Sequence, residues 1–287
     1  MSRLPRIAAL VAGLGLALSA PAAAADVTGA FSSEALPTAV EHGPDPTKES
    51  IGVQGSYEVA SKKLPAKITS GFYGGTIYYP SNPGQGETFG GIVTMPGFVE
   101  PGSTMSTVAQ RLASHGYVVM MAEAPTLFSQ PAARAAAALG AQKVLAADAT
   151  VAPLLDADRT ALVGHSMGGG GVLIAASKSE QDAVVPLHPW AQQGFSSVTE
   201  PVLTVAGALD NVAPIDQHAV PIHQSIGSST KGLLTDLAGT HWAGVVDNKV
   251  IQGRVLSFVK LHVDGDTRYE QFVCAPAEAG FVYRNPC

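Results

Sequence analysis

The sequence predicts an α/β fold in which a mainly parallel β-sheet is covered by helices on both faces. Two observations support this prediction. Short apolar runs rich in Val, Ile and Leu alternate with segments of helical character along most of the chain, which is the pattern of β-α-β units. Hydrophobic residues make up 46% of the chain and charged residues only 14%, so a sizeable core can be buried.

Residues 1–25 are typical of a secretory signal peptide. Arg3 and Arg6 precede the apolar stretch 7–20, and three alanines then supply a small-residue cleavage site. We therefore expect export, with a mature chain of one domain spanning residues 26–287. The apolar stretch is short for a membrane anchor and no other long apolar run follows, so we expect no membrane insertion.

The expected elements follow one another in a regular order. After an N-terminal arm, two runs with alternating or β-branched residues predict antiparallel edge strands, and buried strands and helices then alternate. The expected strands are 57–68, 71–79, 91–96, 117–122, 160–163, 183–187, 201–206 and 233–237. The expected helices are 103–115, 131–147, 171–177, 216–226 and 248–263.

A glycine-rich segment directly after the run 160–163 carries the strongest chemical signal. Residues 164–168 are Gly-His-Ser-Met-Gly, which fits G-x-S-x-G, the sharp strand-to-helix turn that presents a serine nucleophile. Glycines suit this turn because a strained serine leaves little room for neighbouring Cβ atoms. The alternative is a glycine-rich turn with an idle serine, but the strand before and the helix after favour Ser166 as the nucleophile.

A serine nucleophile needs a base, and the base needs an acid that orients it. On this type of fold both follow the serine, acid first, at the ends of later strands. Asp210 comes just after the strand 201–206, whereas Asp216 lies beyond a proline and suits a helix start. His241 lies in the loop after the strand 233–237. We therefore expect Asp210 as the acid and His241 as the base.

Five other histidines have simpler explanations. His218 and His223 fall on the expected helix after Asp210, and His262 lies late in the last helix, where a cation suits the helix dipole. His165 neighbours the serine, so its side chain should point away from the hydroxyl. His188 precedes the acid and breaks the Ser-Asp-His order.

The oxyanion that forms during acyl transfer needs two donors aimed at one point. The backbone N–H of Met167, the residue after the nucleophile, is one candidate. The second should come from the loop after an early strand, which here is Gly97-Phe98. Nothing in this chemistry requires a metal ion or another cofactor.

Charge and cysteine content narrow the possible partners and compartment. The formal net charge is −6, so nucleic acids and anionic membranes are unfavourable partners. The chain has two cysteines, Cys274 and Cys287. In an exported protein we expect such an isolated pair to form a disulfide, and neither cysteine has a nearby histidine or CxxC partner that would indicate catalysis or metal binding.

At this point the residues resemble a known family, the bacterial cutinase-like polyester hydrolases, which include poly(ethylene terephthalate) (PET) hydrolases and related triacylglycerol lipases. The resemblance covers most of the chain from about residue 42 onward. It is carried by the matching segments 96–98, 111–117, 164–171, 189–190, 195–199, 212–214 and 264–269 and by the two cysteines.

The resemblance implies an α/β-hydrolase fold without a lid domain and a triad of Ser166, Asp210 and His241. It implies oxyanion donors at Phe98 and Met167, and a Trp190 side chain that stacks on the substrate. It also implies a disulfide between Cys274 and Cys287. Phe98 stands where the family usually has Tyr, and Trp242 follows the catalytic histidine where relatives have Phe or Ser, so both are expected to shape the substrate site. The loop around Asp210 is one residue shorter than in many relatives.

The spacing of two strands supports a bulky substrate. Only about a dozen residues separate the strands 183–187 and 201–206, too few for an inserted lid. Trp190 and Phe195 in this loop would then be exposed apolar contacts, unless both tuck into the core.

We therefore expect a monomeric, secreted serine esterase that acts on polyesters. The alternatives are a triacylglycerol lipase, a small-ester carboxylesterase, or a non-catalytic surface-binding protein with the same fold.

Overall fold

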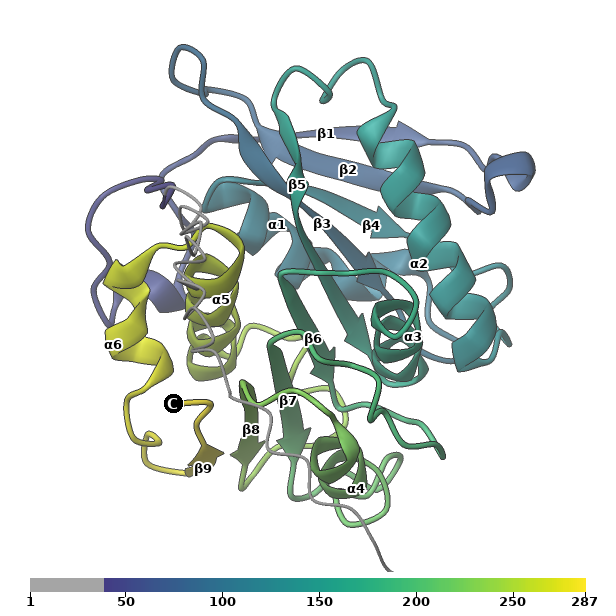
Figure 1. Ribbon diagram of the computed structural model, residues 1–287, viewed down its shortest axis with the longest axis vertical. Helices are drawn as coiled ribbons and strands as arrows, with labels where there is room; N and C mark the ends of the chain where they lie inside the picture. Colours follow the sequence, from purple (N-terminus) through teal and green to yellow (C-terminus); the bar gives the residue numbers. More distant parts are fainter. Residues whose placement is uncertain (1–38) are drawn as a thin grey trace, which may run out of the picture. The chain divides into compact units, whose positions relative to one another are not determined.

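A single nine-stranded sheet runs through residues 39–287, the part of the chain that the computed structural model describes (Figure 1). The strand order is β1-β2-β4-β3-β5-β6-β7-β8-β9. The strands are β1 (Val59–Leu64), β2 (Gly75–Pro80), β3 (Phe89–Met95), β4 (Tyr117–Ala122), β5 (Leu155–His165), β6 (Ala183–Leu187), β7 (Val202–Gly207), β8 (Lys231–Asp236) and β9 (Phe281–Arg284).

The central strands are parallel and the two edges are antiparallel. Strands β4, β3, β5, β6, β7 and β8 pair in parallel, whereas β2 pairs with β4, β1 with β2, and β9 with β8 in the antiparallel sense. The helices are α1 (Ser106–Ser114), α2 (Pro131–Ala146), α3 (Met167–Ala176), α4 (Ala219–Ser225), α5 (Lys249–Val263) and α6 (Glu270–Val273). This arrangement confirms the predicted α/β-hydrolase fold.

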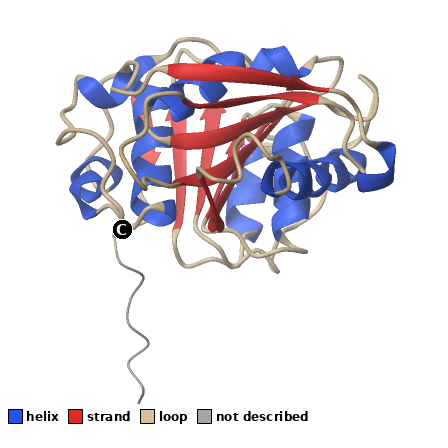
Figure 2. Ribbon diagram, turned by 90° about the horizontal axis from the view of Figure 1, so that it is seen from above, coloured by secondary structure: helices blue, strands red, loops and turns tan. Residues whose placement is uncertain are grey.

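Helices cover both faces of the sheet, and each face has its own core (Figure 2). Side chains of α2, α3 and α4 pack on one face with Val93, Leu162 and Val184. Side chains of α1 and α5 pack on the other face with Ile92 and Val163. Because successive residues of one strand enter opposite cores, the central strands β3, β4, β6 and β7 are buried along their whole length, as is typical of parallel strands covered on both faces.

Most expected elements are present with small shifts at their ends, but one expected helix begins later than predicted, and the short elements α6 and β9 have no predicted counterpart. The helix expected over 216–226 begins only at Ala219, so Asp216 is not a helix-start residue and lies exposed in the preceding turn. The strand β9 was not expected. It is four residues long and pairs with β8, which lies far earlier in the chain, so no local pattern marks it.

The C-terminal tail is covalently fixed, as predicted. Cys274 at the end of α6 forms a disulfide with Cys287, and β9 lies in the loop that this bond closes. Arg254 of α5 also holds the tail, since its guanidinium donates to the backbone oxygens of Phe272, Ala275 and Pro276. A closed loop of this size is worth about 3 kcal/mol of folding free energy in the chain-entropy model.

The predicted signal peptide, residues 1–25, lies outside the described residues, so this boundary and that of the mature domain stay predictions. Among residues 39–287, no helix is long and apolar enough to cross a membrane.

Candidate active site

The expected site residues come from loops at one edge of the sheet. Strands β3, β5, β6, β7 and β8 are parallel neighbours, so their carboxyl ends lie together. Phe98, Ser166, Trp190, Asp210 and His241 follow these five strands in turn. This edge is where ligands bind in open α/β sheets.

Ser166 occupies the sharp turn that the sequence predicts. It links the end of β5 to the start of α3 and has φ 54° and ψ −121°, a strained conformation for a residue with a side chain. The glycines of the motif are needed for space. A Cβ on Gly164 would overlap the carbonyl of Gly168, and a Cβ on Gly168 would overlap the carbonyl of Met95 at the end of β3.

The expected acid and base are in direct contact. Nδ1 of His241 lies 2.7 Å from Oδ2 of Asp210, and both side chains are buried. Oδ1 of Asp210 accepts hydrogen bonds from the backbone N–H groups of Val212 and Ala213. The remaining ring nitrogen of His241, Nε2, has no hydrogen-bond partner within residues 39–287, so the expected hydrogen bond from the Ser166 hydroxyl is not formed and Nε2 is free to accept a proton.

A second histidine, His188, also reaches the acid. Its Nδ1 lies 3.3 Å from Oδ2 of Asp210, on the oxygen that His241 uses. Burial lowers the pKa of His188, so its ring is neutral near pH 7. Burial alone would raise the pKa of the Asp210 carboxyl, but hydrogen bonds from His188, His241 and Ala213 outweigh it and hold that pKa well below its usual range. Asp210 is therefore ionised.

The two expected oxyanion donors are both free to donate. Met167 is the first residue of α3, where the N–H has no acceptor within the helix. The N–H of Phe98 makes no hydrogen bond within the described part of the chain, although its neighbours Gly97 and Val99 donate to Glu100 and Leu127. The N-terminal end of α3 adds its dipole to this side of Ser166, which favours a developing negative charge.

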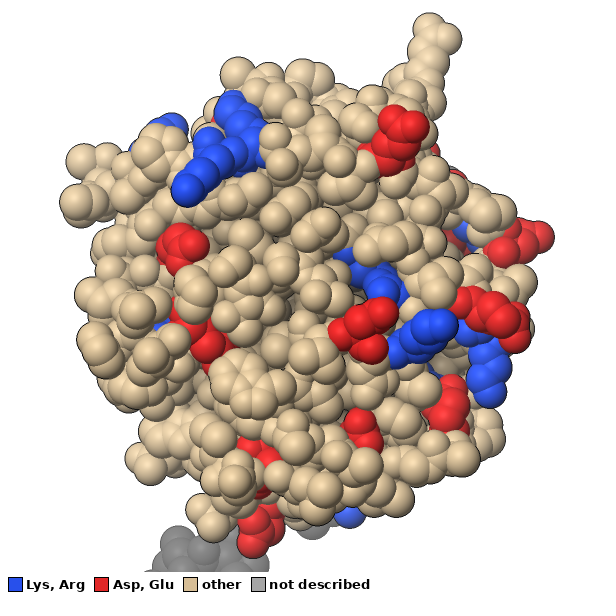
Figure 3. Space-filling view, turned by 180° about the vertical axis from the view of Figure 1, so that it is seen from behind, with Lys and Arg blue, Asp and Glu red and all other residues tan. Residues whose placement is uncertain are grey.

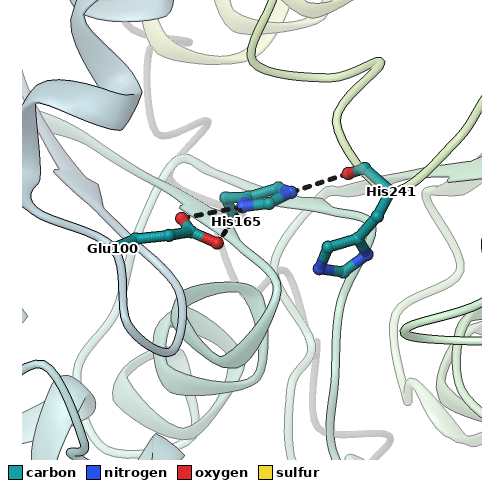
Figure 4. A group of neighbouring side chains, drawn as sticks. All are labelled: Glu100, His165 and His241. Carbon is teal, nitrogen blue, oxygen red and sulfur yellow. Dashed lines mark hydrogen bonds and ion pairs between the residues drawn. The ribbon is translucent and has the colours of Figure 1, made fainter.

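A buried ion pair of Glu100 and His165 contacts the backbone of His241 (Figure 4). Nδ1 of His165 is 2.9 and 3.0 Å from the two carboxylate oxygens of Glu100, and its Nε2 is 2.8 Å from the backbone oxygen of His241. Oε2 of Glu100 also accepts the N–H of Gly97 at 2.7 Å. In Figure 4 the carbonyl of His241 points at His165, and the His241 ring lies beside the His165 ring, with centroids 4.7 Å apart.

Backbone strain in the described chain is concentrated at this site. Among residues 39–287, the non-glycine residues with positive φ are Val99, Ser166 and His188. Each stands in the loop that follows one of the neighbouring strands β3, β5 and β6. Strained residues persist only where surrounding contacts fix them, and they are typical of active sites.

The two aromatic residues of the β6–β7 loop, Trp190 and Phe195, differ in burial. Trp190 is half-buried, and its ring packs on His218 at 5.4 Å between centroids. His218 is the residue before α4 and its Nδ1 contacts the oxygen of Ala191. Phe195 is 2% exposed and belongs to the core beside α4, so its expected role as an exposed contact is wrong.

Several apolar side chains beside the site are exposed. Phe98 is 41% and Trp242 is 46% exposed, and Phe128, at 67%, packs edge-to-face on Phe98. Leu209 and Val212, on either side of Asp210, are exposed as well. Large apolar side chains at such positions favour an apolar or surface-bound ligand.

Two groups of side chains have metal-ligand geometry. These are Glu100, His165 and His241, and His188, Asp210 and His241. In both groups the ring nitrogens that face the carboxylates are already in hydrogen bonds to them, so these atoms serve each other as partners. The expectation that catalysis needs no metal or cofactor stays a prediction.

The contacts of Glu100 with His165 and of His188 with Asp210 are not predicted by the sequence. His188 was set aside because it precedes Asp210, which excludes a role as the base but not a contact with the acid. His165 was expected only to point away from the serine hydroxyl. The one local signal for Glu100 is its charge, which stands in an otherwise uncharged stretch two residues after Phe98, the expected oxyanion donor.

Comparison with known proteins gives consistent matches over most of the chain. The family model described as PET hydrolase-like matches residues 34–285. Cutinase 1 from Thermobifida cellulosilytica is 37% identical over 259 residues, which are 86% of this chain and 97% of that protein. Bis(hydroxyethyl) terephthalate hydrolase from Streptomyces coelicolor is 37% identical over 281 residues, which are 94% of this chain and 90% of the relative. A cutinase from Thermobifida fusca is 37% identical over 259 residues, which are 86% of this chain and 85% of that protein.

Proposed function

Because the chain belongs to the PET hydrolase-like family of carboxylic ester hydrolases, we propose that it cleaves polyesters with Ser166 as the nucleophile. Asp210 orients His241, and Nε2 of His241 accepts the proton of the Ser166 hydroxyl as the oxygen attacks the ester carbonyl. The observation that carries this proposal is the 2.7 Å contact between His241 and Asp210, with Nε2 of His241 left unpartnered.

The oxyanion of the tetrahedral intermediate is held by the N–H groups of Phe98 and Met167. When the intermediate collapses, His241 donates its proton to the leaving alcohol and Ser166 remains acylated. A water molecule, deprotonated by His241, then attacks the acyl group, and Ser166 leaves with the proton that His241 returns. Each N–H donor of the oxyanion hole, that of Phe98 and that of Met167, is expected to raise kcat roughly 10²- to 10³-fold.

The surroundings of the site favour a polymeric or surface-bound ester. The loop between β6 and β7 carries no lid, and Phe98, Phe128 and Trp242 are exposed beside Ser166 and His241. Trp190, which is backed by His218, is placed to stack on an acyl group. Among the relatives, the cutinases are named for the polyester cutin, and bis(hydroxyethyl) terephthalate hydrolase is named for a small terephthalate ester.

We also propose that the protein is an exported monomer. The signal-peptide pattern of residues 1–25 and the disulfide support export. On the face shown in Figure 3, basic side chains stand in small groups with acidic side chains nearby and with broad uncharged areas between them. Together with the net charge of −6, this gives no support for a nucleic-acid partner.

Product release from a panel of substrates tests the substrate class. The purified enzyme is incubated with PET film, cutin, tributyrin emulsion and p-nitrophenyl butyrate, each beside Ser166→Ala. Soluble terephthalate products from the film, absent with Ser166→Ala, are expected. Hydrolysis of tributyrin without any attack on film or cutin would instead support a lipase, and activity on p-nitrophenyl butyrate alone a small-ester carboxylesterase. Inactivity on every ester would support a non-catalytic binding protein.

A further inference from the structure

We propose that Glu100 is a positioning residue that, through His165, holds the oxyanion loop and the loop of the catalytic base in one geometry. The oxyanion loop is defined here as residues 97–100. The proposal rests on the proposed function, because it assigns Glu100 to the support of Phe98 and His241. Neither Glu100 nor His165 has a part in the proton transfers described above.

Glu100 first fixes the oxyanion loop. Its Oε2 accepts the N–H of Gly97, and its own N–H contacts the carbonyl of Gly97 at 3.3 Å. The intervening Val99 has φ 59°, which is an unfavourable conformation for a β-branched residue. A loop strained in this way keeps its shape only when both of its ends are held. The N–H of Phe98 lies between these two ends.

His165 then connects Glu100 to the base. A carbonyl oxygen can only accept a hydrogen bond, so Nε2 of His165 carries a proton that it donates to the backbone oxygen of His241. The other proton lies between Nδ1 and the Glu100 carboxylate. The pair is therefore neutral as a whole, and its bond to the backbone of His241 fixes the place from which the His241 ring extends.

The packing leaves this unit little freedom to move. A Cβ on Gly97 would overlap the side chains of Glu100 and Ser166, so the oxyanion loop, the ion pair and the nucleophile are in close contact. The side chains of His165 and Glu100 are 0% and 5% exposed. A buried ion pair is a weak source of stability compared with apolar side chains of similar volume, so a positional role explains it better than a stabilising one.

Three single variants separate this role from a general loss of structure. Glu100→Ala removes the side-chain contacts with the N–H of Gly97 and with Nδ1 of His165. Glu100→Gln keeps both contacts, since its amide oxygen can accept from Gly97 and its NH₂ can donate to Nδ1 of His165. The matched control is Glu123→Ala, because Glu123 also accepts a backbone N–H, that of Gly102 at 2.8 Å, without touching His165.

Steady-state kinetics with p-nitrophenyl butyrate are measured per active site, counted with a fluorophosphonate probe. We expect Glu100→Ala to lower kcat roughly 10- to 100-fold with KM changed less than about 3-fold, because oxyanion contacts act mainly in the transition state. Glu100→Gln and Glu123→Ala are expected within about 3-fold of wild type. The affinity of phenylboronic acid, whose adduct is tetrahedral, should fall in Glu100→Ala in parallel with kcat/KM.

A double variant covers the case in which Glu100→Ala does not fold. Glu100→Leu with His165→Phe replaces the ion pair by apolar groups, so stability should be kept while kcat falls at least 10-fold. Wild-type kcat in this variant, or in folded Glu100→Ala, would overturn the proposal, as would a Glu100→Gln variant as impaired as Glu100→Ala. If the wild-type protein itself is not labelled by the probe, the proposed function fails, and the role of Glu100 with it.

Discussion

Two histidine–carboxylate pairs lie side by side in this molecule, and they differ in what the far ring nitrogen contacts. His241 and His165 each direct Nδ1 at a buried carboxylate, that of Asp210 and that of Glu100. Nε2 of His165 is occupied by a backbone carbonyl, whereas Nε2 of His241 has no partner among residues 39–287. The ring centroids are only 4.7 Å apart.

This difference shows that a carboxylate partner does not by itself make a histidine a base. The carboxylate fixes the orientation of the ring and the proton on Nδ1 in both pairs. Only the pair whose second nitrogen is free can exchange a proton with a substrate, and the other pair can only hold a position. The same two residue types thus transfer protons in the pair of His241 and Asp210 and fix loop positions in the pair of His165 and Glu100.

Removing the free nitrogen should have the largest effect. His241→Ala is expected to lower kcat on the order of 10⁵-fold or more, as the loss of the base does in serine hydrolases. Added imidazole should restore part of this activity by supplying the missing base at the position that the ring leaves vacant. The measurement is p-nitrophenyl butyrate hydrolysis with and without imidazole. Activity near wild type in His241→Ala would exclude His241 as the base.

Replacing the acid should cost somewhat less. Asp210→Asn is expected to lower kcat on the order of 10⁴-fold, because the amide no longer selects the proton on Nδ1 of His241. The matched control is Asp216→Asn, the exposed carboxylate that was rejected as the acid, which should stay within about 2-fold of wild type. Equal losses in the two variants would contradict the assignment of Asp210.

The second histidine on the acid should have a moderate effect. His188→Gly removes one hydrogen bond from Asp210 without adding strain, since glycine tolerates the φ of 45° found there. A hydrogen bond as long as this one is worth about 1 kcal/mol, so kcat should fall about 5-fold. The pKa of Asp210 should rise because its ionised form loses a donor, but the hydrogen bonds from His241 and Ala213 remain and keep the carboxylate ionised near pH 7.

Hydrolysis of p-nitrophenyl butyrate at pH 7.5 tests this prediction. We expect kcat to fall in His188→Gly and to stay within about 2-fold of wild type in the control His223→Gln, which lies on α4. An unchanged kcat in His188→Gly would show that His188 does not assist Asp210.

Replacing His262, which contacts no carboxylate among the described residues, should change folding stability and leave catalysis unchanged. His262 packs on Phe258 with centroids 4.4 Å apart, and burial lowers its pKa to about 4. Between pH 6.5 and 4 the unfolded chain binds a proton that the native protein excludes, so the wild-type protein loses stability as the pH falls through this range. His262→Phe removes this loss.

Urea unfolding at pH 7.5 and pH 4.5 measures the difference. The difference in free energy of unfolding between His262→Phe and wild type should shift by about 2 kcal/mol in favour of the variant when the pH falls from 7.5 to 4.5. The kcat of the variant at pH 7.5 should be unchanged. A relative stability that is independent of pH would show that His262 does not titrate in this way.

The features that the sequence predicted are those with short-range signals. The buried strands follow from continuous apolar runs, and the turn at Ser166 follows from its glycines. Asp210 and His241 follow from the order of groups along parallel strands, and the bond between their side chains supports that choice. The disulfide between Cys274 and Cys287 is present as expected.

The missed features depend on contacts between distant segments. Glu100 meets His165 and His188 meets Asp210 only after the sheet has brought separate loops together. Phe195 looked like a surface aromatic because its loop lies between two strands, but α4 gives it a core to join. A chain-order rule finds the base and does not find the residues that support it.

The most direct test of the free-nitrogen assignment is covalent labelling of Ser166. The wild-type protein, His241→Ala and Glu100→Gln are each treated with a fluorophosphonate, digested, and analysed by mass spectrometry. We expect rapid labelling of Ser166 alone in the wild type and in Glu100→Gln, and labelling slowed at least 10³-fold in His241→Ala. Label on another residue, or equally fast labelling without His241, would contradict Ser166 as a nucleophile activated by His241.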